Sequence, residues 1–161
     1  MSLPLDGCIA LVTGASRGIG AAVAERFAAE GADLILVART IGGLEELDDR
    51  IQSLGRHATL VPLDLTDGGG IDYLGGAIAE RYGRLDILVG NAAELGRLGP
   101  IAHFSPEEWQ PVLDVNLTAN WRLIRSFDPL LRAANAGRAI FVTSGVARNA
   151  TAYWGAYAVS K

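Results

Sequence analysis

The stretch "CIALVTGASRGIG", residues 8–20, decides the fold of this chain. It opens with a short apolar run rich in strand formers and continues into a turn in which Gly14, Gly18 and Gly20 follow the spacing G-x-x-x-G-x-G. Residues 21–30 then have the composition of a helix and are followed by another glycine. A strand, a glycine-rich turn and a helix in this order predict the first unit of a parallel sheet.

The same alternation continues along the chain. Four further apolar runs predict strands, at residues 33–38, 58–65, 85–91 and 138–144. Segments of helical pattern lie at residues 42–55, 71–83, about 105–136, and from about 155 onward. The third of these helices is expected to begin after the N-cap Ser105, with Glu108 completing a capping box. We expect it to be kinked at Pro111 and Pro129.

Strands that are apolar on both faces and alternate with helices form parallel sheets covered on both sides. We therefore expect a single α/β domain over residues 1–161, a doubly wound parallel sheet of the Rossmann type with three α/β/α layers. We see neither an internal repeat nor a linker. In such sheets, ligands bind beyond the carboxyl ends of the strands.

Composition and charge argue against several classes of protein. The net charge is −4, and the basic residues are scattered instead of forming the stripe that nucleic acid requires. No apolar run is long enough to span a bilayer, and the N-terminus lacks the order of a signal peptide. Cys8 is the only cysteine, and His57 and His103 are the only histidines. We therefore expect a soluble cytoplasmic protein with no metal site, no Ser-His triad, and neither nucleic acid nor membrane as a partner.

The glycine-rich turn at residues 13–20 predicts a nucleotide site. Glycines allow a tight turn and a close approach to a pyrophosphate, and the N–H groups that begin the next helix point towards it. The spacing differs from the commoner G-x-G-x-x-G fingerprint, and the alternative is a plain turn without a ligand. Its position between the first strand and a helix favours the nucleotide.

The end of the second predicted strand indicates which nucleotide is bound. An acid usually binds the adenosine ribose there, but the strand ends "LVAR", and Ala38 cannot accept a hydrogen bond from a 2′-hydroxyl. Arg39 follows it and Arg17 lies in the glycine-rich turn, so both guanidinium groups are able to converge on a 2′-phosphate. This favours NADP(H), with NAD(H) as the second choice. The alternative is two solvated surface arginines.

The last five residues, "YAVSK", contain Tyr157 and Lys161 four positions apart. Four residues are about one helical turn, so on a helix both side chains share a face. A neighbouring ammonium group favours the phenolate form of a phenol, which suits it to proton exchange near neutral pH. Taken singly, each would be an ordinary surface residue of a helix.

With these motifs in this order, the sequence resembles the short-chain dehydrogenase/reductase family over its whole length. "TGASRGIG" (13–20) looks like the family's cofactor turn, and "LDL" (63–65) looks like its adenine segment, in which Asp64 would meet the adenine amino group. "GNAA" (90–93) is similar to the family's N-N-A-G, although Gly90 replaces the first Asn. The resemblance and the arginine argument together imply these cofactor-binding residues: Gly14, Ser16, Arg17, Gly18, Ile19, Gly20, Arg39, Asp64, Leu65, Asn91, Ala92, Tyr157 and Lys161.

The resemblance also implies an activity, the transfer of hydride between NADP(H) and a carbonyl or secondary alcohol. Ser144 would orient the substrate oxygen and Tyr157 would act as general acid and base. Lys161 would support Tyr157 and hold the nicotinamide ribose, and Asn116 would position a water in a proton relay. The serine motif reads Thr143-Ser144 where the family has a double serine. A homodimer or homotetramer is implied for the full-length protein, with a small carbonyl or alcohol as substrate.

Family members continue well past the lysine, with two more strands and a loop that covers the substrate. Without them the fold is expected to be incomplete at its C-terminus, with residues 138–144 as an exposed apolar edge and barely one turn of the last helix. Either only part of a longer enzyme is ordered, or the chain is shortened, or a half-domain persists as a non-catalytic nucleotide-binding or partner-binding module. We prefer the first explanation, and the third is the alternative function.

Overall fold

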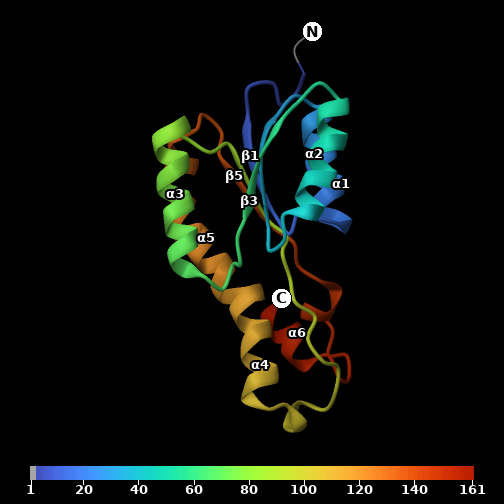
Figure 1. Cartoon of the computed structure of the whole chain (residues 1–161). Helices are drawn as coiled ribbons and strands as arrows, with labels where there is room; N and C mark the ends of the chain where they lie inside the picture. Colours follow the sequence, from blue (N-terminus) through green and yellow to red (C-terminus); the bar gives the residue numbers. More distant parts are fainter. Residues whose placement is uncertain (1–2) are drawn as a thin grey trace.

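Five parallel strands with helices on both faces form the body of the computed structural model, which describes residues 3–161 (Figure 1). The strands are β1 (Ile9–Thr13), β2 (Asp33–Ala38), β3 (Ala58–Pro62), β4 (Ile87–Gly90) and β5 (Arg138–Phe141). The α-helices are α1 (Gly18–Ala29), α2 (Gly42–Ser53), α3 (Gly68–Tyr82), α4 (Pro106–Leu113), α5 (Ala119–Ala133) and α6 (Gly155–Ser160). Three shorter turns complete the chain: the 3₁₀ turns η1 (Ile101–His103) and η3 (Gly145–Ala147), and the π-helical turn η2 (Asp114–Thr118).

The strand order is β3-β2-β1-β4-β5, and every neighbouring pair is parallel. Helices α1 and α2 pack on one face of the sheet, and α3 and α5 on the other (Figure 1). This confirms the doubly wound parallel sheet. The chain reverses its direction of winding between β1 and β4, which places the switch point at the carboxyl ends of these two strands.

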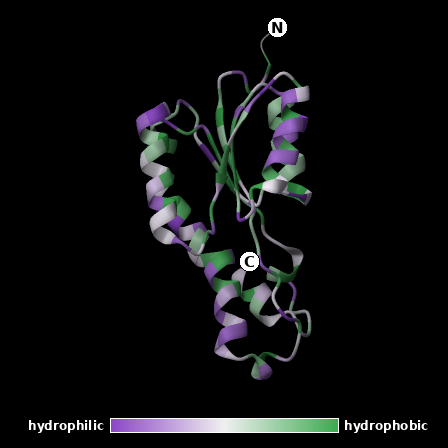
Figure 2. Cartoon of the chain, in the orientation of Figure 1, coloured by the Kyte–Doolittle hydropathy of each residue, from purple (hydrophilic) through white to green (hydrophobic). Residues whose placement is uncertain are grey.

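The central strand β1 shows why helices cover both faces of the sheet. All five of its residues are buried. Ala10 and Val12 belong to the core under α1 and α2, whereas Ile9 and Leu11 belong to the core under α3 and α5. Figure 2 shows the matching pattern, with apolar strands between helices whose polar residues lie largely away from the sheet.

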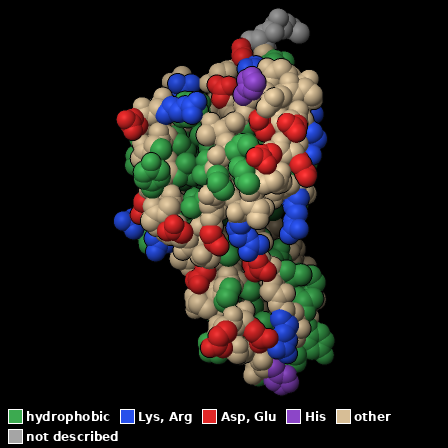
Figure 3. Space-filling model, in the orientation of Figure 1, with side chains coloured by type: hydrophobic (Ala, Val, Ile, Leu, Met, Phe, Trp, Pro, Cys, Tyr) green, Lys and Arg blue, Asp and Glu red, His purple; other side chains and the backbone are tan. Residues whose placement is uncertain are grey.

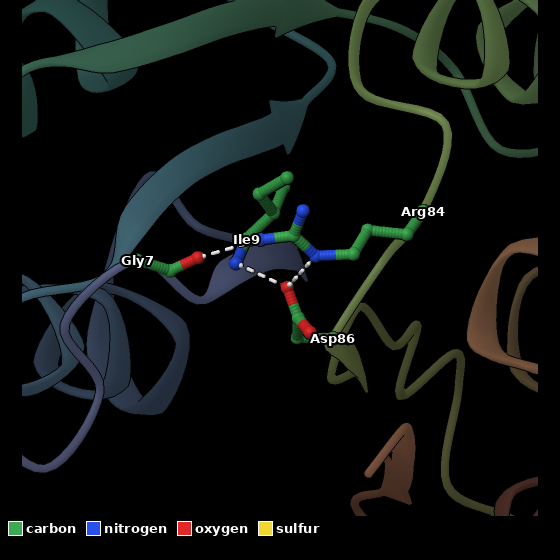
Figure 4. Close-up of polar contacts among 4 residues, drawn as sticks. All are labelled: Gly7, Ile9, Arg84 and Asp86. Carbon is green, nitrogen blue, oxygen red and sulfur yellow. Dashed lines mark hydrogen bonds and ion pairs between the residues drawn. The ribbon is translucent and has the colours of Figure 1, made fainter. Parts of the chain in front are cut away.

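A polar clamp fixes the amino ends of β1 and β4 (Figure 4). The Oδ2 atom of Asp86 accepts hydrogen bonds from the backbone N–H of Ile9 at 2.9 Å and from Nε of Arg84 at 3.2 Å. Arg84 also donates to the carbonyl oxygen of Gly7 at 2.9 Å. These contacts tie the two central strands together at the end of the sheet opposite the switch point.

Several element boundaries differ from the predicted ones, for local reasons. Strand β3 ends at Pro62, short of the predicted residue 65, because β2 is its only neighbour in the sheet and ends at Ala38, the partner of Pro62. Helix α3 begins at Gly68, three residues earlier than predicted, because the side chain of Asp67 accepts a hydrogen bond from the N–H of Gly70 and caps the helix. The capping box of Ser105 and Glu108 is confirmed.

The long helix predicted from residue 105 is divided into α4, η2 and α5. The helix type changes at the π-helical turn, and α5 continues through Pro129 as far as Ala133. Helix α5 lies on the sheet, while α4 and α6 pack together below the carboxyl ends of the strands (Figure 1). Strand β5 is an edge with Ile140 half exposed, as expected.

Candidate active site

A cavity of about 320 Å³ lies at the carboxyl ends of β1 to β4, where the sheet switches direction. All of the predicted cofactor residues line it except Gly20, Tyr157 and Lys161. Figure 3 shows acidic and basic side chains where the molecule narrows above its lower lobe. The cavity walls are formed by these residues: Gly14, Ser16, Arg17, Gly18, Ile19, Val37, Ala38, Arg39, Leu63, Asp64, Leu65, Asn91, Ala92, Ala93, Glu94 and Val115.

The three glycines of the turn are required for different reasons. A Cβ atom at Gly14 would lie 2.8 Å from the Cα atom of Ala92, and one at Gly20 would lie 2.3 Å from the carbonyl oxygen of Gly14. These two glycines therefore let the turn pack against the end of β4. Gly18 has a φ of +58° and nothing within 4 Å of its missing Cβ, so it opens onto the cavity. That open side is suited to the close approach of a phosphate.

Thr13 joins the turn to β4 and was not singled out from the sequence. It is fully buried, and its Oγ1 accepts hydrogen bonds from the backbone N–H of Asn91 at 3.0 Å and of Ala92 at 3.1 Å. Its hydroxyl donates to the carbonyl oxygen of Val89 at 3.3 Å. Asn91 returns a contact, since its Nδ2 donates to the carbonyl oxygens of Thr13 and Gly14. The floor of the cavity is thus fixed by the side chains of Thr13, in β1, and Asn91, directly after β4.

The rim of the cavity carries two arginines and an acid. Arg17 and Arg39 are exposed, and neither has an ion-pair partner among residues 3–161. The backbone N–H and the hydroxyl of Thr66 donate to Oδ1 of Asp64, and these bonds, with a smaller contribution from the charge of Arg39, lower the pKa of that carboxyl. Asp64 is therefore a carboxylate acceptor at neutral pH, as its predicted contact with an amino group requires.

Asn116 lies in the π-helical turn η2 and is buried. Its Oδ1 accepts from the N–H of Glu94 at 2.7 Å, while its Nδ2 donates to the carbonyl oxygen of Glu94 and to Oγ of Ser160, each at 2.8 Å. Ser160 donates in turn to the carbonyl oxygen of Tyr157 at 2.8 Å. The side chain of Asn116 therefore ties the loop after β4 to helix α6, and Glu94 and Ser160 are parts of this arrangement that the sequence did not reveal.

Helix α6 brings the predicted tyrosine and lysine together. The Nζ atom of Lys161 lies 5.8 Å from the centre of the Tyr157 ring and donates to the carbonyl oxygen of Val142 at 2.6 Å. The carbonyl oxygen of Lys161 accepts from the hydroxyl of Thr143 at 2.8 Å. The ammonium group is half buried, and this desolvation lowers its pKa.

Ser144 directly follows Val142 and Thr143, the two residues after β5 that hold Lys161. Its Oγ accepts from the N–H of Val146 at 3.5 Å, so it caps the 3₁₀ turn η3, which packs against α6. The ring of Tyr157 also makes an edge-to-face contact with Trp154, at 5.9 Å between ring centres. The four predicted catalytic residues thus lie in η2, in the segment after β5, and in α6 with the residue that follows it. The hydrogen bonds of Asn116 to Glu94 and Ser160 link η2 and α6 to the nucleotide cavity.

Within residues 3–161, no group of three or more histidine, cysteine, aspartate or glutamate side chains is arranged to hold a metal ion. No helix in the same range has the length and apolar character needed to cross a bilayer.

A glycine-rich turn at the switch point of a doubly wound parallel sheet places this chain in the class of nucleotide-binding α/β proteins. The sequence model of the short chain dehydrogenases matches residues 8–161, and the chain belongs to that family.

Among similar proteins, the uncharacterized oxidoreductase YciK of Escherichia coli is 39% identical over 160 residues. The match covers 98% of this chain and 64% of YciK. The 2,3-dihydro-2,3-dihydroxybenzoate dehydrogenase of Bacillus subtilis is 36% identical over 157 residues, covering 98% of this chain and 60% of that enzyme. The chain therefore spans less than two thirds of the length of these relatives.

Solved structures show the same similarity. The structure of yciK from E. coli superposes with a TM-score of 0.94 at 38% identity, covering 100% of this chain and 67% of that one. An E. coli protein assigned to the short chain dehydrogenases, solved in complex with NADPH, gives a TM-score of 0.93 at 37% identity. That match covers 99% of this chain and 68% of the other.

Proposed function

We propose that this protein is an oxidoreductase that transfers hydride between NADP(H) and a carbonyl or secondary alcohol, with Tyr157 as general acid and base. The observation that carries the proposal is the Nζ atom of Lys161, 5.8 Å from the centre of the Tyr157 ring, on a helix tied to the nucleotide cavity through Asn116. We propose Asn116, Ser144, Tyr157 and Lys161 as the catalytic set.

The cavity supports NADP(H) as the cofactor, with NAD(H) as the second choice. Gly18 opens onto it where a pyrophosphate would approach the start of α1, and the exposed guanidinium groups of Arg17 and Arg39 stand at its rim. Two unpaired guanidinium groups suit the double charge of a 2′-phosphate. The neighbour solved with NADPH supports the same choice. Asp64 would accept from the adenine amino group.

The proposed roles follow from what each side chain is able to do. The cofactor, when bound, supplies or accepts the hydride. The phenol of Tyr157 donates a proton to the substrate oxygen as a carbonyl becomes an alcohol, and takes it back in the reverse direction. The ammonium group of Lys161 favours the phenolate that remains. The hydroxyl of Ser144 orients the substrate oxygen. Asn116, whose side chain ties α6 to the loop after β4, positions a water in a proton relay.

We further propose that the protein works in the cytoplasm as a homodimer or homotetramer. The lone Cys8 is consistent with a reducing compartment. Leu117 of η2 and Trp121 and Ile124 of α5 follow one another at spacings of four and three residues, so they share one side of the helix. Each is about half exposed, and such a group of apolar side chains favours a protein contact. Light scattering of the purified protein tests the assembly, and a monomer would contradict it.

The experiment that tests the function is an assay of NADPH oxidation over a broad panel of aldehydes and ketones. Replacing Tyr157 with Phe is expected to lower kcat by about 10²–10⁴-fold with nearly unchanged NADPH affinity, because the proton donor is lost and the other cofactor contacts are kept. Tyr73→Phe, on the exposed surface of α3, is the matched control and should be fully active. Turnover that survives in Tyr157→Phe would contradict the mechanism. Binding of NADPH without turnover across the whole panel would favour the non-catalytic module.

A further inference from the structure

Asn120, in the first turn of α5, contacts the candidate active site but belongs to none of the catalytic motifs. Its Nδ2 donates a hydrogen bond of 2.7 Å to the carbonyl oxygen of Asn116, four residues earlier in the π-helical turn η2. In a regular α-helix this carbonyl would accept from the backbone N–H four residues later. The side chain of Asn120 gives it an additional donor, within the irregular turn in which Asn116 lies.

The space for this side chain comes from Gly90, at the end of β4. A Cβ atom at Gly90 would lie 2.7 Å from Oδ1 of Asn120 and 2.4 Å from Cδ1 of Phe141. Any side chain at Gly90 would therefore displace Asn120 or the ring of Phe141. The glycine at the end of β4 and the asparagine at the start of α5 form a complementary pair.

Asn116 is held on both sides by this arrangement. Its backbone carbonyl is bonded by Asn120, and its side chain is bonded to the backbone of Glu94 and to Ser160. Ser160 reaches the carbonyl oxygen of Tyr157. A continuous series of hydrogen bonds therefore runs from Asn120 to the helix that carries the tyrosine. Asn116 and Tyr157 are proposed catalytic residues, and Ser160 lies next to Lys161. Glu94 and Asn120 belong to no catalytic motif.

We propose that Asn120 is a positioning residue of the active site, whose side-chain amide fixes the π-helical turn and, through Asn116 and Ser160, the position of helix α6, which carries Tyr157. The catalytic part of this inference rests on the proposed oxidoreductase function. Its structural part does not, because the hydrogen bonds connect segments of this chain whatever reaction it carries out.

The test uses two variants of nearly unchanged size. Asn120→Leu removes the donor, and Asn120→Asp replaces the donor with a carboxylate that repels the carbonyl oxygen of Asn116. Ser126→Ala is the matched control, because it removes a side-chain hydrogen bond of the same helix, to Asp72, at a distance from Asn116. Thermal unfolding first identifies which variants are folded, and either folded Asn120 variant is sufficient for the test.

Hydrogen–deuterium exchange measures the structural part. In both Asn120 variants, residues 155–161 should exchange about tenfold faster, as the loss of one hydrogen bond to a buried partner implies, while residues 13–20 do not change. Ser126→Ala should leave α6 at the wild-type rate. Wild-type exchange in α6 for a folded Asn120 variant would overturn the proposal. So would an Asn120→Asp variant that matches the wild type, since the side chain would then only fill space.

Kinetics measure the catalytic part, with a carbonyl compound that the wild type reduces. We expect kcat to fall about tenfold in both variants with the KM for NADPH unchanged, because the donor helix is misplaced and the cofactor cavity is not. A rise in the KM for NADPH that accompanies the fall in kcat would overturn the positioning role, and so would an unchanged kcat. If the wild type reduces no carbonyl of the panel, the proposed oxidoreductase function fails, and the exchange of α6 alone decides the role of Asn120.

Discussion

The Nζ atom of Lys161 lies 5.8 Å from the centre of the Tyr157 ring and, at the same time, 2.6 Å from the carbonyl oxygen of Val142. One side chain therefore provides a cation beside the tyrosine and attaches the end of α6 to the segment after β5. It is also the only lysine of the 161 residues. The titration of its amino group is therefore measurable without overlapping signals from other lysines of this chain.

The titration of Lys161 is the first prediction. Burial lowers its pKa below the usual 10.5, so the signal of ¹³C-labelled lysine should shift at a lower pH in the folded protein than after unfolding. Because the unfolded chain then binds more protons between the two pKa values, the free energy of unfolding should rise as the pH increases through that interval. Lys161→Met should lack this rise. An unshifted titration would contradict the burial of the ammonium group.

The two rim arginines lead to the second prediction. Arg17→Ala and Arg39→Ala should each weaken NADPH binding about tenfold or more, the usual loss for a hydrogen bond to a charged group, and should leave NADH binding unchanged. Arg26→Ala is the matched control, since Arg26 lies on α1 and pairs with Glu30 away from the cavity. Calorimetric titration measures all three. Equal losses for both nucleotides would show that the arginines do not contact a 2′-phosphate.

Thr13 supplies the third prediction. Thr13→Val keeps the shape but leaves the N–H groups of Asn91 and Ala92 without their acceptor, which should lower the free energy of unfolding by about 1–3 kcal/mol and weaken NADPH binding. Thr13→Ser keeps the acceptor and loses only a methyl group, at a cost of about 1 kcal/mol with nucleotide binding retained. Denaturant unfolding compares the two. A Val variant as tight for NADPH as the Ser variant would be evidence against the hydroxyl as the link between β1 and β4.

The packing of the glycine-rich turn gives the fourth prediction. A methyl group at Gly20 would lie 2.3 Å from the carbonyl oxygen of Gly14 and 2.6 Å from Nδ2 of Asn91, neither of which has room to move. Gly20→Ala should therefore destabilise the protein by about 1–3 kcal/mol, the usual cost of overpacking, and open the cavity floor. Gly42→Ala, in the first turn of α2 with nothing within 4 Å, should be neutral or stabilising. Thermal unfolding that ranks the two variants in the opposite order would contradict this packing.

Much of the fold could be predicted because it depends on local patterns. The run at residues 8–13 is apolar at every position because β1 is covered on both faces, and the glycines that follow it are required by contacts a few residues away. Boundaries were less certain where a contact outside the pattern decided them, as the end of β2 at Ala38 does for β3 and the cap by Asp67 does for α3.

Of the candidate site, too, only the part that depends on local spacing could be predicted from the sequence. Tyr157 and Lys161 are one helical turn apart, so their proximity could be predicted from spacing alone. The partners of Asn116 could not, because Glu94 and Ser160 are 22 and 44 positions away and become neighbours only when the loop after β4, η2 and α6 meet. Thr13 and Asn91, 78 positions apart, show the same limit. Their contacts depend on the strand order, which spacing does not reveal.

The most direct test of the central claim is to follow the hydride itself. NADPH carrying deuterium at C4 of the nicotinamide, prepared separately with the label on each face, is incubated with the purified protein and a carbonyl panel, and the products are analysed by mass spectrometry. We predict an alcohol that contains deuterium from one of the two labelled forms, and the loss of this product in Tyr157→Phe. Binding of NADPH with no deuterium in any product, from either face, would contradict an oxidoreductase and leave a nucleotide-binding module.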